Sequence, residues 1–256
     1  MTGDFRPAVA LNEVCKRFPL ANHSGQGERP RDGRFVALDR VSLTVSRGEC
    51  LVVGGANGSG KSLLMLIIAG LEDPSSGTVE THGTVGLVFQ EADTQILGET
   101  PAEDVAFGAK NLGLSKNETR RRVDDALDAV GLTGKANFPA RTLSGGEKRR
   151  LSVAGILAMD ASTVILDEPY ANLDYHGVLQ VNRLAESLLQ SGKTLILLTH
   201  ELEKCLGLAD HFVVLHRGQK VFDGKTAALP GLPLERWGIR NPLEARGALI
   251  GDLVWR

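Results

Sequence analysis

The segment that most constrains this fold is the glycine-rich run Gly55-Ala-Asn-Gly-Ser-Gly-Lys61-Ser62, which fits the pattern G-x-x-x-x-G-K-[ST]. An apolar run typical of a strand, Cys50–Val53, precedes it, and a helical pattern over Ser62–Leu71 follows it. A strand, a glycine-rich turn and a helix together form a cradle in which backbone amides and the helix N-terminus meet phosphate oxygens. This context favours a phosphate-binding loop over a chance glycine-rich turn. The residues expected to contact a nucleotide are Gly55, Asn57, Gly58, Ser59, Gly60, Lys61 and Ser62.

A second strand end carries two carboxylates, in the run Val164-Ile-Leu-Asp167-Glu168. An acidic turn after a strand is common and by itself has little meaning. Combined with Lys61 and Ser62 it predicts a Mg-nucleotide site, because such a site needs both an anion cradle and carboxylate oxygens. Asp167 is expected to hold Mg²⁺, with Ser62 as a further ligand, and Glu168 to polarise an attacking water.

Composition restricts the broad class of protein. The chain has 256 residues, enough for one large α/β domain with at most a small appendage. Its net charge of −2 does not suggest a nucleic-acid binder. Three scattered cysteines, Cys15, Cys50 and Cys205, are best interpreted as buried or idle thiols in a reducing compartment. No apolar run approaches the ~20 residues of a membrane span, so we expect any link to a membrane to go through a partner.

Short β-rich runs alternate with helical stretches, which predicts an α/β architecture. Besides the elements above, a surface loop is expected over Pro19–Arg34, and helices are expected after a Ser115–Glu118 capping box and over Glu147–Met159. A hairpin of His211–Leu215 and Lys220–Phe222 is expected to close the sheet. The remaining predicted strands are Val9–Phe18, Phe35–Val45, Val85–Phe89 and Thr194–Leu198.

The run Leu143-Ser-Gly-Gly-Glu147, called the signature segment below, precedes a helix and lies upstream of the acidic pair. Here the chain resembles the ABC ATPase subunits over nearly its whole length. Its signature is similar to LSGGQ with Glu in the last place. Further matches are Gln90 to the Q-loop, Ala171–Asp174 to the D-loop and His200 to the switch histidine, and Phe18 lies where an adenine-stacking aromatic is found. Singly these would be weak, since a lone Phe18 or His200 is more often structural.

The resemblance implies a P-loop NTPase of ABC type, with a RecA-like core, an antiparallel β subdomain and a helical signature subdomain. It implies an ABC ATPase domain over residues 1–227, with the helical part at roughly 91–160, and a short C-terminal extension over 228–256. Two chains would pack head to tail and bind ATP and Mg²⁺ between the phosphate loop of one and the signature of the other. The implied catalytic residues are Glu168, His200 and Gln90, the metal-binding residues Ser62, Gln90 and Asp167, and the further nucleotide-binding residues Phe18, Ser144, Gly145, Gly146, Glu147 and Asp174.

The stretch from Val85 to Leu114, with Gln95 after the Q-loop and Glu103-Asp104-Val-Ala-Phe-Gly108, resembles the ATPases of energy-coupling-factor importers for cobalt, nickel or vitamins. That implies a peripheral protein on the cytoplasmic face of the membrane. Its partners would be a second ATPase chain, identical or paralogous, a transmembrane coupling subunit and a substrate-binding membrane subunit. Residues 95–104 would receive a coupling helix, with Glu103 and Asp104 offering carboxylates to basic groups; the alternative is an ordinary exposed acidic turn.

The chain departs from the family pattern at four positions near these motifs: Ala56 stands for Pro, Leu63 for Thr, Tyr170 for Thr or Ser, and Tyr175 for Pro. Two other functions remain as alternatives. A soluble ABC ATPase of DNA repair would carry long heptad repeats after Gln90, which this chain lacks. A non-hydrolysing half of a heterodimer is disfavoured by the intact Lys61, Glu168 and His200.

Overall fold

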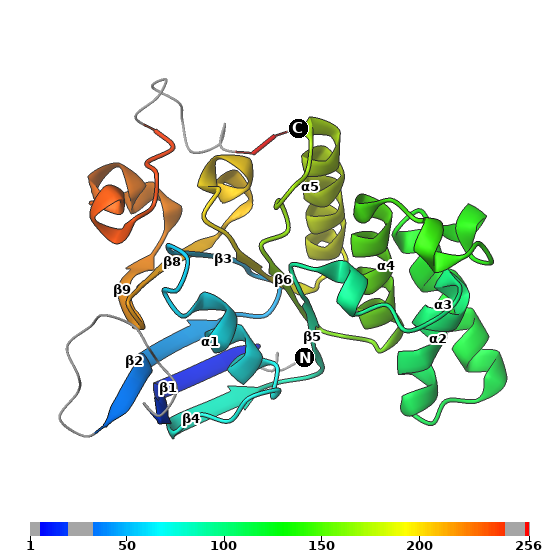
Figure 1. Cartoon of the computed structure of the whole chain (residues 1–256), viewed down its shortest axis with the longest axis horizontal. Coiled ribbons are helices and arrows are strands. Elements are labelled where there is room, and N and C mark those ends of the chain that lie inside the picture. Colours follow the sequence, from blue (N-terminus) through cyan, green and yellow to red (C-terminus); the bar gives the residue numbers. More distant parts are fainter. Residues whose placement is uncertain (1–5, 20–32, 244–253, 256) are drawn as a thin grey trace, which may run out of the picture.

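The computed structural model describes residues 6–19, 33–243 and 254–255. A six-stranded sheet in the order β5-β6-β7-β3-β8-β9 forms its centre (Figure 1). The first five strands in that order are parallel, and β9 closes the sheet as a hairpin partner of β8. Their bounds are β3 Cys50–Gly54, β5 Val85–Val88, β6 Thr163–Asp167, β7 Thr194–Leu198, β8 His211–His216 and β9 Gln219–Gly224. The strands predicted from the apolar runs and the predicted hairpin are thereby confirmed.

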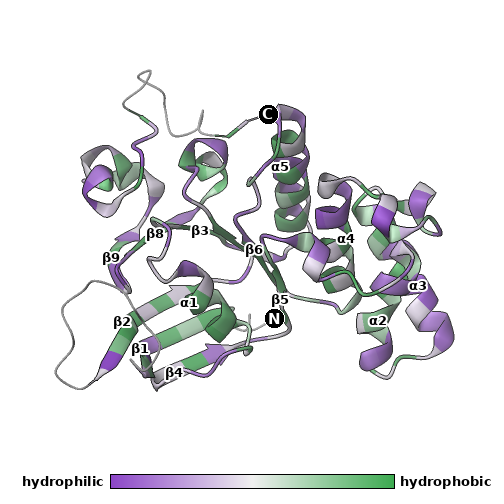
Figure 2. Ribbon diagram, in the orientation of Figure 1, coloured by the Kyte–Doolittle hydropathy of each residue, from purple (hydrophilic) through white to green (hydrophobic). Residues whose placement is uncertain are grey.

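The central strands are buried on both faces, which explains why they are continuously apolar and do not alternate with polar residues. Along β3, Cys50 and Val52 join one hydrophobic core while Leu51 and Val53 join the other. The same division holds along β6 and β7. Figure 2 shows these strands as uniformly hydrophobic. The sheet therefore separates two cores, and its geometry is held from both sides.

A smaller antiparallel sheet in the order β2-β1-β4 covers one of these cores together with helix α1 (Figure 1). Its strands are β1 Val9–Pro19, β2 Arg34–Val45 and β4 Ser76–Thr81. The antiparallel β subdomain is as expected, although β4 was not predicted: five of its six residues are exposed, so it carries no apolar run. Residues 20–32 of the predicted surface loop lie outside the described residues, but its ends, Pro19 and Arg34, pair across β1 and β2.

Helices α2, α3 and α4 pack together beyond β5, on the opposite side of the molecule from the small sheet (Figure 1). The α-helices are α1 Lys61–Ile68, α2 Pro101–Asn111, α3 Lys116–Ala129, α4 Gly145–Ala158 and α5 Tyr175–Gln190. Among the described residues, no helix is both long and apolar enough to span a membrane.

The expected capping box at the start of α3 forms only in part. The Ser115 side chain accepts a hydrogen bond from the Glu118 amide at 3.3 Å, as predicted. The Glu118 carboxylate instead pairs with Arg122 one turn along the helix, at 3.7 Å. Complete capping boxes occur at α2, with Thr100 and Glu103, and at α4, with Ser144 and Glu147. Two glutamates expected to serve function thus contribute to local folding.

The C-terminal extension begins with a short helix and a turn. A 3-10 helix, Leu234–Trp237, ends at Gly238 in the left-handed region with φ 72°. Ile239 is buried beside the Phe212 ring, close to Gly54. Residues 244–253, which would form the rest of the tail, lie outside the described residues, and Val254 and Trp255 pack back near α5 (Figure 1).

Candidate nucleotide site

Parallel strands bring the candidate site residues to a single edge of the sheet. In the strand order β5-β6-β7-β3, the carboxyl ends lead to Gln90, to Asp167 and Glu168, to His200, and to the phosphate loop Gly55–Ser62. Ligands of open α/β sheets bind outside the carboxyl ends of the strands. Four segments that are far apart in the sequence are therefore neighbours in one row.

The phosphate loop folds around the side chain of its own lysine. Lys61 is only 4% exposed, and its Nζ donates hydrogen bonds to the carbonyl oxygens of Gly55 at 2.6 Å and Ala56 at 3.2 Å. Burial lowers the pKa of Lys61, opposed by the negative charges of Glu168 and Asp167. The ammonium group is thereby held across the loop, where a phosphate oxygen could replace a carbonyl as its partner.

Two glycines are required by space and by backbone conformation. A Cβ on Gly55 would lie 2.6 Å from the Leu215 carbonyl oxygen, so any side chain would push the loop off β8. Gly60 has φ 103°, a conformation that other residues avoid, and caps α1 at its N-terminus. The predicted helix at Ser62 thus begins one residue earlier, at Lys61, and its first amides face the loop.

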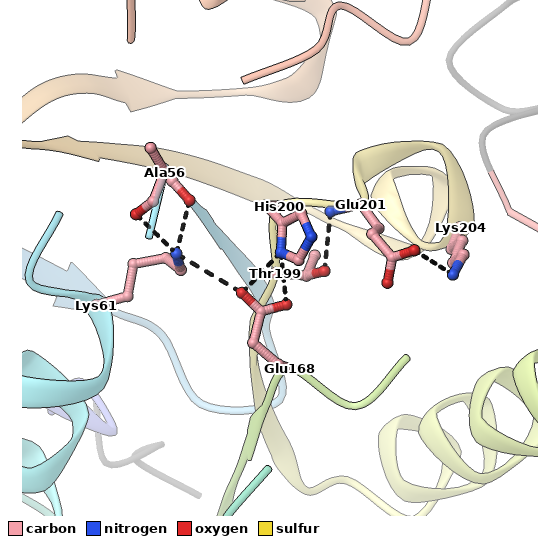
Figure 3. A network of polar contacts seen from close by, with 8 residues as sticks. Ala56, Lys61, Glu168, Thr199, His200, Glu201 and Lys204 are labelled. Atoms are coloured by element: carbon pink, nitrogen blue, oxygen red, sulfur yellow. Dashed lines mark hydrogen bonds and ion pairs between the residues drawn. The ribbon is translucent and has the colours of Figure 1, made fainter. Parts of the chain in front are cut away.

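Glu168 lies at the centre of a buried polar network (Figure 3). Its carboxylate is 3.0 Å and 3.1 Å from Nδ1 of His200 and 3.6 Å from Nζ of Lys61. The backbone of Glu168 has φ 44°, a left-handed conformation that costs energy for a residue with a side chain, and its amide is held by the Leu198 carbonyl at 2.9 Å. Strain of this kind concentrates at functional sites.

Asp167 has the properties expected of a metal ligand. Its Oδ1 is buried and finds no hydrogen-bond partner within the part of the chain that the structure describes. Burial raises the pKa of its carboxyl, and a hydrogen bond from Ser62 partly offsets that effect. An orphaned carboxylate oxygen beside a serine hydroxyl and a lysine fits a hard divalent cation such as Mg²⁺, which would restore the lost solvation.

The signature segment caps helix α4 and points its first residues outward. Ser144 and Gly145 are exposed at the helix N-terminus, where free amides favour anions. The Glu147 carboxylate accepts from the Ser144 amide at 2.9 Å and from Lys135 Nζ at 2.6 Å, and these contacts lower its pKa, the Lys135 bond most. Glu147 was expected to contact nucleotide; here its carboxylate is used to fix the cap.

A residue that was not predicted, Arg149, joins the signature helix to the sheet edge. Its guanidinium donates to the Pro169 carbonyl at 2.6 Å and the Gln90 carbonyl at 3.2 Å, and the side chain is 8% exposed. Gln90 itself is exposed. No sequence signal singled out Arg149, because it lies within the charged run Glu147-Lys-Arg-Arg150 at the start of the helix.

The remaining predicted nucleotide contacts lie at the borders of the site. Phe18 is half-buried near the end of β1, with Lys16 Nζ 5.3 Å from its ring centroid. Asp174 is the N-cap residue of α5, and its Oδ1 accepts a hydrogen bond from the Gly177 amide at 2.8 Å. Tyr170, one of the four departures from the family pattern, is fully buried, and its hydroxyl donates to Asn182 Oδ1 at 2.8 Å.

The acidic pair that was expected to bind a partner also forms hydrogen bonds within the chain. Asp104 Oδ1 accepts from the amides of Leu97 and Gly98 at 2.7 Å and 2.9 Å, and so closes the turn before α2. Glu103 completes the capping box with Thr100. Both carboxylates form these bonds because they occupy the first turn of a helix, where acidic residues accept hydrogen bonds from free amides.

The three cysteines are free and buried, as expected, and burial raises the pKa of Cys50 to about 12.

Comparison with known sequences finds the family described as ABC transporter over residues 38–171. The cobalt import ATP-binding protein CbiO of Rhodobacter capsulatus is 40% identical over 228 residues, covering 82% of this chain and 81% of that protein. The energy-coupling factor transporter ATP-binding protein EcfA of Carboxydothermus hydrogenoformans is 40% identical, covering 81% of this chain and 82% of that protein.

Solved structures give the same result for the fold. CbiO1 of Clostridium perfringens, part of a CbiONQ transporter complex, superimposes with a TM-score of 0.76 at 30% identity, covering 88% of this chain and 91% of that one. The ATP-binding cassette MJ0796, solved as a dimer in a post-hydrolysis state with ADP and Pi, gives a TM-score of 0.71 at 26% identity. The match covers 85% of this chain and 98% of that one. This chain therefore belongs to the ABC transporter family, as one of its ATP-binding, ATP-hydrolysing subunits.

Proposed function

We propose that the chain drives an importer of the energy-coupling-factor type, on the cytoplasmic face of the membrane, for a transition-metal ion such as cobalt or nickel, or for a vitamin. The observation that carries the catalytic half of this proposal is the contact of Glu168 with both His200 and Lys61 at the sheet edge. The importer half rests on the similarity to CbiO and EcfA. The net charge of −2 argues against nucleic acid as a partner.

In this proposal the amides of Gly55–Ser62 and the Lys61 ammonium bind the phosphates of ATP. Ser62, Asp167 and Gln90 would hold Mg²⁺, and the ion would supply positive charge beside the phosphate oxygens. Glu168 orients the attacking water and accepts its proton, while His200 keeps the carboxylate in place and contacts the γ-phosphate. Phe18 stacks on adenine.

The site is completed by a second copy or a paralogue, packed head to tail. Ser144, Gly145 and Gly146 of one chain, fixed by the Glu147 cap, supply a hydroxyl and free amides to the γ-phosphate bound by the other. Asp174 couples the two sites. We assign the ATPase domain to residues 1–227, with its helical part at roughly 91–160, and the extension to 228–256.

The proposed membrane partner docks on an apolar surface of the helical part. Leu97, Phe107 and Phe138 are 69%, 52% and 52% exposed. The segments that carry Leu97 and Phe138 run side by side, since the Ala140 amide donates to the Glu99 carbonyl at 2.8 Å and the Ala102 amide to the Ala136 carbonyl at 2.9 Å. Phe107 lies on α2, the helix that follows Leu97. Exposed apolar side chains on neighbouring segments are typical of a protein interface.

The catalytic half is tested with Glu168→Gln, by size-exclusion chromatography with light scattering and ATPase rates. The amide should keep ATP binding but not accept a proton, so the variant should accumulate an ATP-bound dimer with little turnover. A variant as active as the parent chain would refute the role of Glu168. A variant that stays monomeric with ATP, beside an equally inactive parent chain, would point to a paralogous partner.

The importer half is tested by purifying the tagged chain from detergent-solubilised membranes of its host. We expect integral membrane subunits to co-purify, and Phe107→Asp with Phe138→Asp to release them while ATP-driven dimerisation persists. Leu71→Asp is the matched control, because Leu71 is 61% exposed but follows α1, outside the proposed surface. Retention by the double variant would refute the docking surface. A chain that dimerises with ATP and never associates with membranes would favour the soluble ABC ATPase.

A further inference from the structure

Trp255 docks against two segments that lead to the catalytic row. Its ring centroid lies 5.5 Å from that of Tyr175, the first residue of α5 directly after the D-loop Ala171–Asp174. On its other side, Lys204 Nζ lies 5.6 Å from the indole centroid. The indole thus lies between the start of α5 and the end of the segment that follows His200.

Hydrogen bonds from a buried side chain to the Trp255 backbone fix this position. Asn182, which is 2% exposed, donates from one amide nitrogen to the carbonyl oxygens of Trp255 and Lys204, both at 2.9 Å. Its Oδ1 accepts from the buried hydroxyl of Tyr170, which directly precedes the D-loop. A single buried amide therefore joins the Trp255 backbone, the segment after His200 and the residue before the D-loop.

The contacts continue to the switch histidine. Lys204, buried and 6.0 Å from the Tyr170 ring centroid, forms an ion pair with Glu201 (Figure 3). The Glu201 amide is held by the Thr199 hydroxyl at 3.0 Å, and His200 lies between them in the chain. Tyr170 and Tyr175, both departures from the family pattern, thus meet Trp255 in one cluster.

We propose that Trp255 is a positioning residue for ATP hydrolysis. Docked between Tyr175 and Lys204, its indole holds the D-loop and the Thr199–Lys204 segment in the relative position that places His200 against Glu168. Its contacts are with Tyr175, Lys204 and Asn182 and not with the phosphate loop, so it acts on turnover and leaves ATP binding unchanged. The inference rests on the ATPase activity and is independent of the importer role.

The test compares Trp255→Ala with Trp255→Phe in the full-length chain. Displacing the segment that carries His200 should lower kcat by about tenfold or more, with the KM for ATP unchanged. Phenylalanine keeps an aromatic face against Tyr175 and Lys204 and should restore most of the rate. Unchanged kcat in Trp255→Ala, or an equal loss in both variants, would overturn the proposal.

Tyr175→Ala removes the same ring contact from a side chain that is 53% exposed, so it should fold even where Trp255→Ala does not. The two losses of kcat should be non-additive, and additive losses would refute a shared action.

A spectroscopic measurement needs no turnover: in a Trp237→Phe background, Trp255 is the single tryptophan of the chain. With Glu168→Gln introduced into the same chain, the fluorescence emission of Trp255 should shift when Mg-ATP is added. Unchanged emission would contradict a link between Trp255 and the nucleotide site.

Discussion

The sheet edge and the signature segment differ in how far their polar groups are satisfied within the chain. At the edge, Lys61, Glu168 and Asp167 are all nearly buried, and Lys61 and Glu168 contact each other and neighbouring residues. At the signature, Ser144 and Gly145 are exposed and only their cap is internal. The first region is a nearly complete site, whereas the second presents free amides outward. This difference is the physical basis for expecting two chains per site.

The strongest test of this comparison removes the charge at the sheet edge. Lys61→Ala deletes the buried ammonium that faces both the loop carbonyls and Glu168, so ATP binding and turnover should be lost together, with the rate falling about 10³-fold or more. Nucleotide binding by calorimetry and phosphate release measure the two effects. Lys193→Ala, which removes a surface lysine paired with Asp160, is the control and should be neutral. Full ATP binding in Lys61→Ala would show that the loop amides suffice.

A substitution in the signature segment should affect dimerisation and not the binding of ATP to one chain. Ser144→Arg places a long charged side chain at the exposed start of α4, so ATP binding to one chain should persist while ATP-driven dimerisation is lost and turnover falls about 10²-fold. Fluorescent-nucleotide binding and light scattering distinguish these effects. Loss of ATP binding in this variant would mean that the two regions act within one chain.

Mixing the two inactive variants sharpens the comparison further. A heterodimer of Lys61→Ala and Ser144→Arg contains one site with an intact phosphate loop and an intact signature. With random pairing and independent sites, the mixture should recover at most roughly a quarter of the parent rate. Recovery from two inactive proteins is specific to head-to-tail packing. A mixture as inactive as its components would argue against shared sites, or for strict coupling between them.

A smaller effect is expected where the two regions meet. Arg149→Lys keeps the charge but replaces the planar fork that reaches both Pro169 and Gln90 with a single ammonium, leaving one buried carbonyl without its donor. We expect a loss of about 1–3 kcal/mol in the free energy of unfolding. Urea denaturation measures it, with Arg150→Lys as the neighbouring control. Equal stability of the two variants would show that the link is dispensable.

The smallest effect concerns the signature cap. Contacts with Lys135 and the Ser144 amide lower the pKa of Glu147, so its stabilising contribution is present above its ordinary pKa of 4.5 and disappears as the pH falls through the lowered value. Glu147→Gln keeps a carbonyl for the amide and loses the charge. Its unfolding free energy should differ from that of the parent chain by at most about 1 kcal/mol at neutral pH, and the two should converge in acid. A difference that persists in acid would exclude the charge as its cause.

The sequence predicted the sheet edge better than its surroundings. Lys61, Asp167 and His200 each follow a short apolar run, and parallel strands oblige such ends to meet. Strand β4 could not be found in this way because its side chains are mostly exposed. Arg149 and Asn182 were missed because their importance comes from backbone carbonyls distant in the chain, those of Gln90 and Trp255.

Two glutamates that the family resemblance linked to function also have structural roles. Glu103 and Glu147 were given partner and nucleotide roles through their place in motifs, yet each bonds the amide of its own N-cap. The pattern S/T-x-x-E is a capping signal in its own right, and it occurs at both positions. A motif residue can thus contribute to the folding of the motif itself.

The central place of β3 has a consequence for how the protein is made. β3 leads into the phosphate loop, but its two neighbours in the sheet, β7 and β8, are synthesised much later: Gly48 bonds Thr194, 146 residues on, and Cys50 bonds Asp210, 160 residues on. A chain emerging from the ribosome therefore carries the loop long before the two strands that flank β3 can hold it. We therefore expect productive nucleotide binding only after nearly all of the core has been translated.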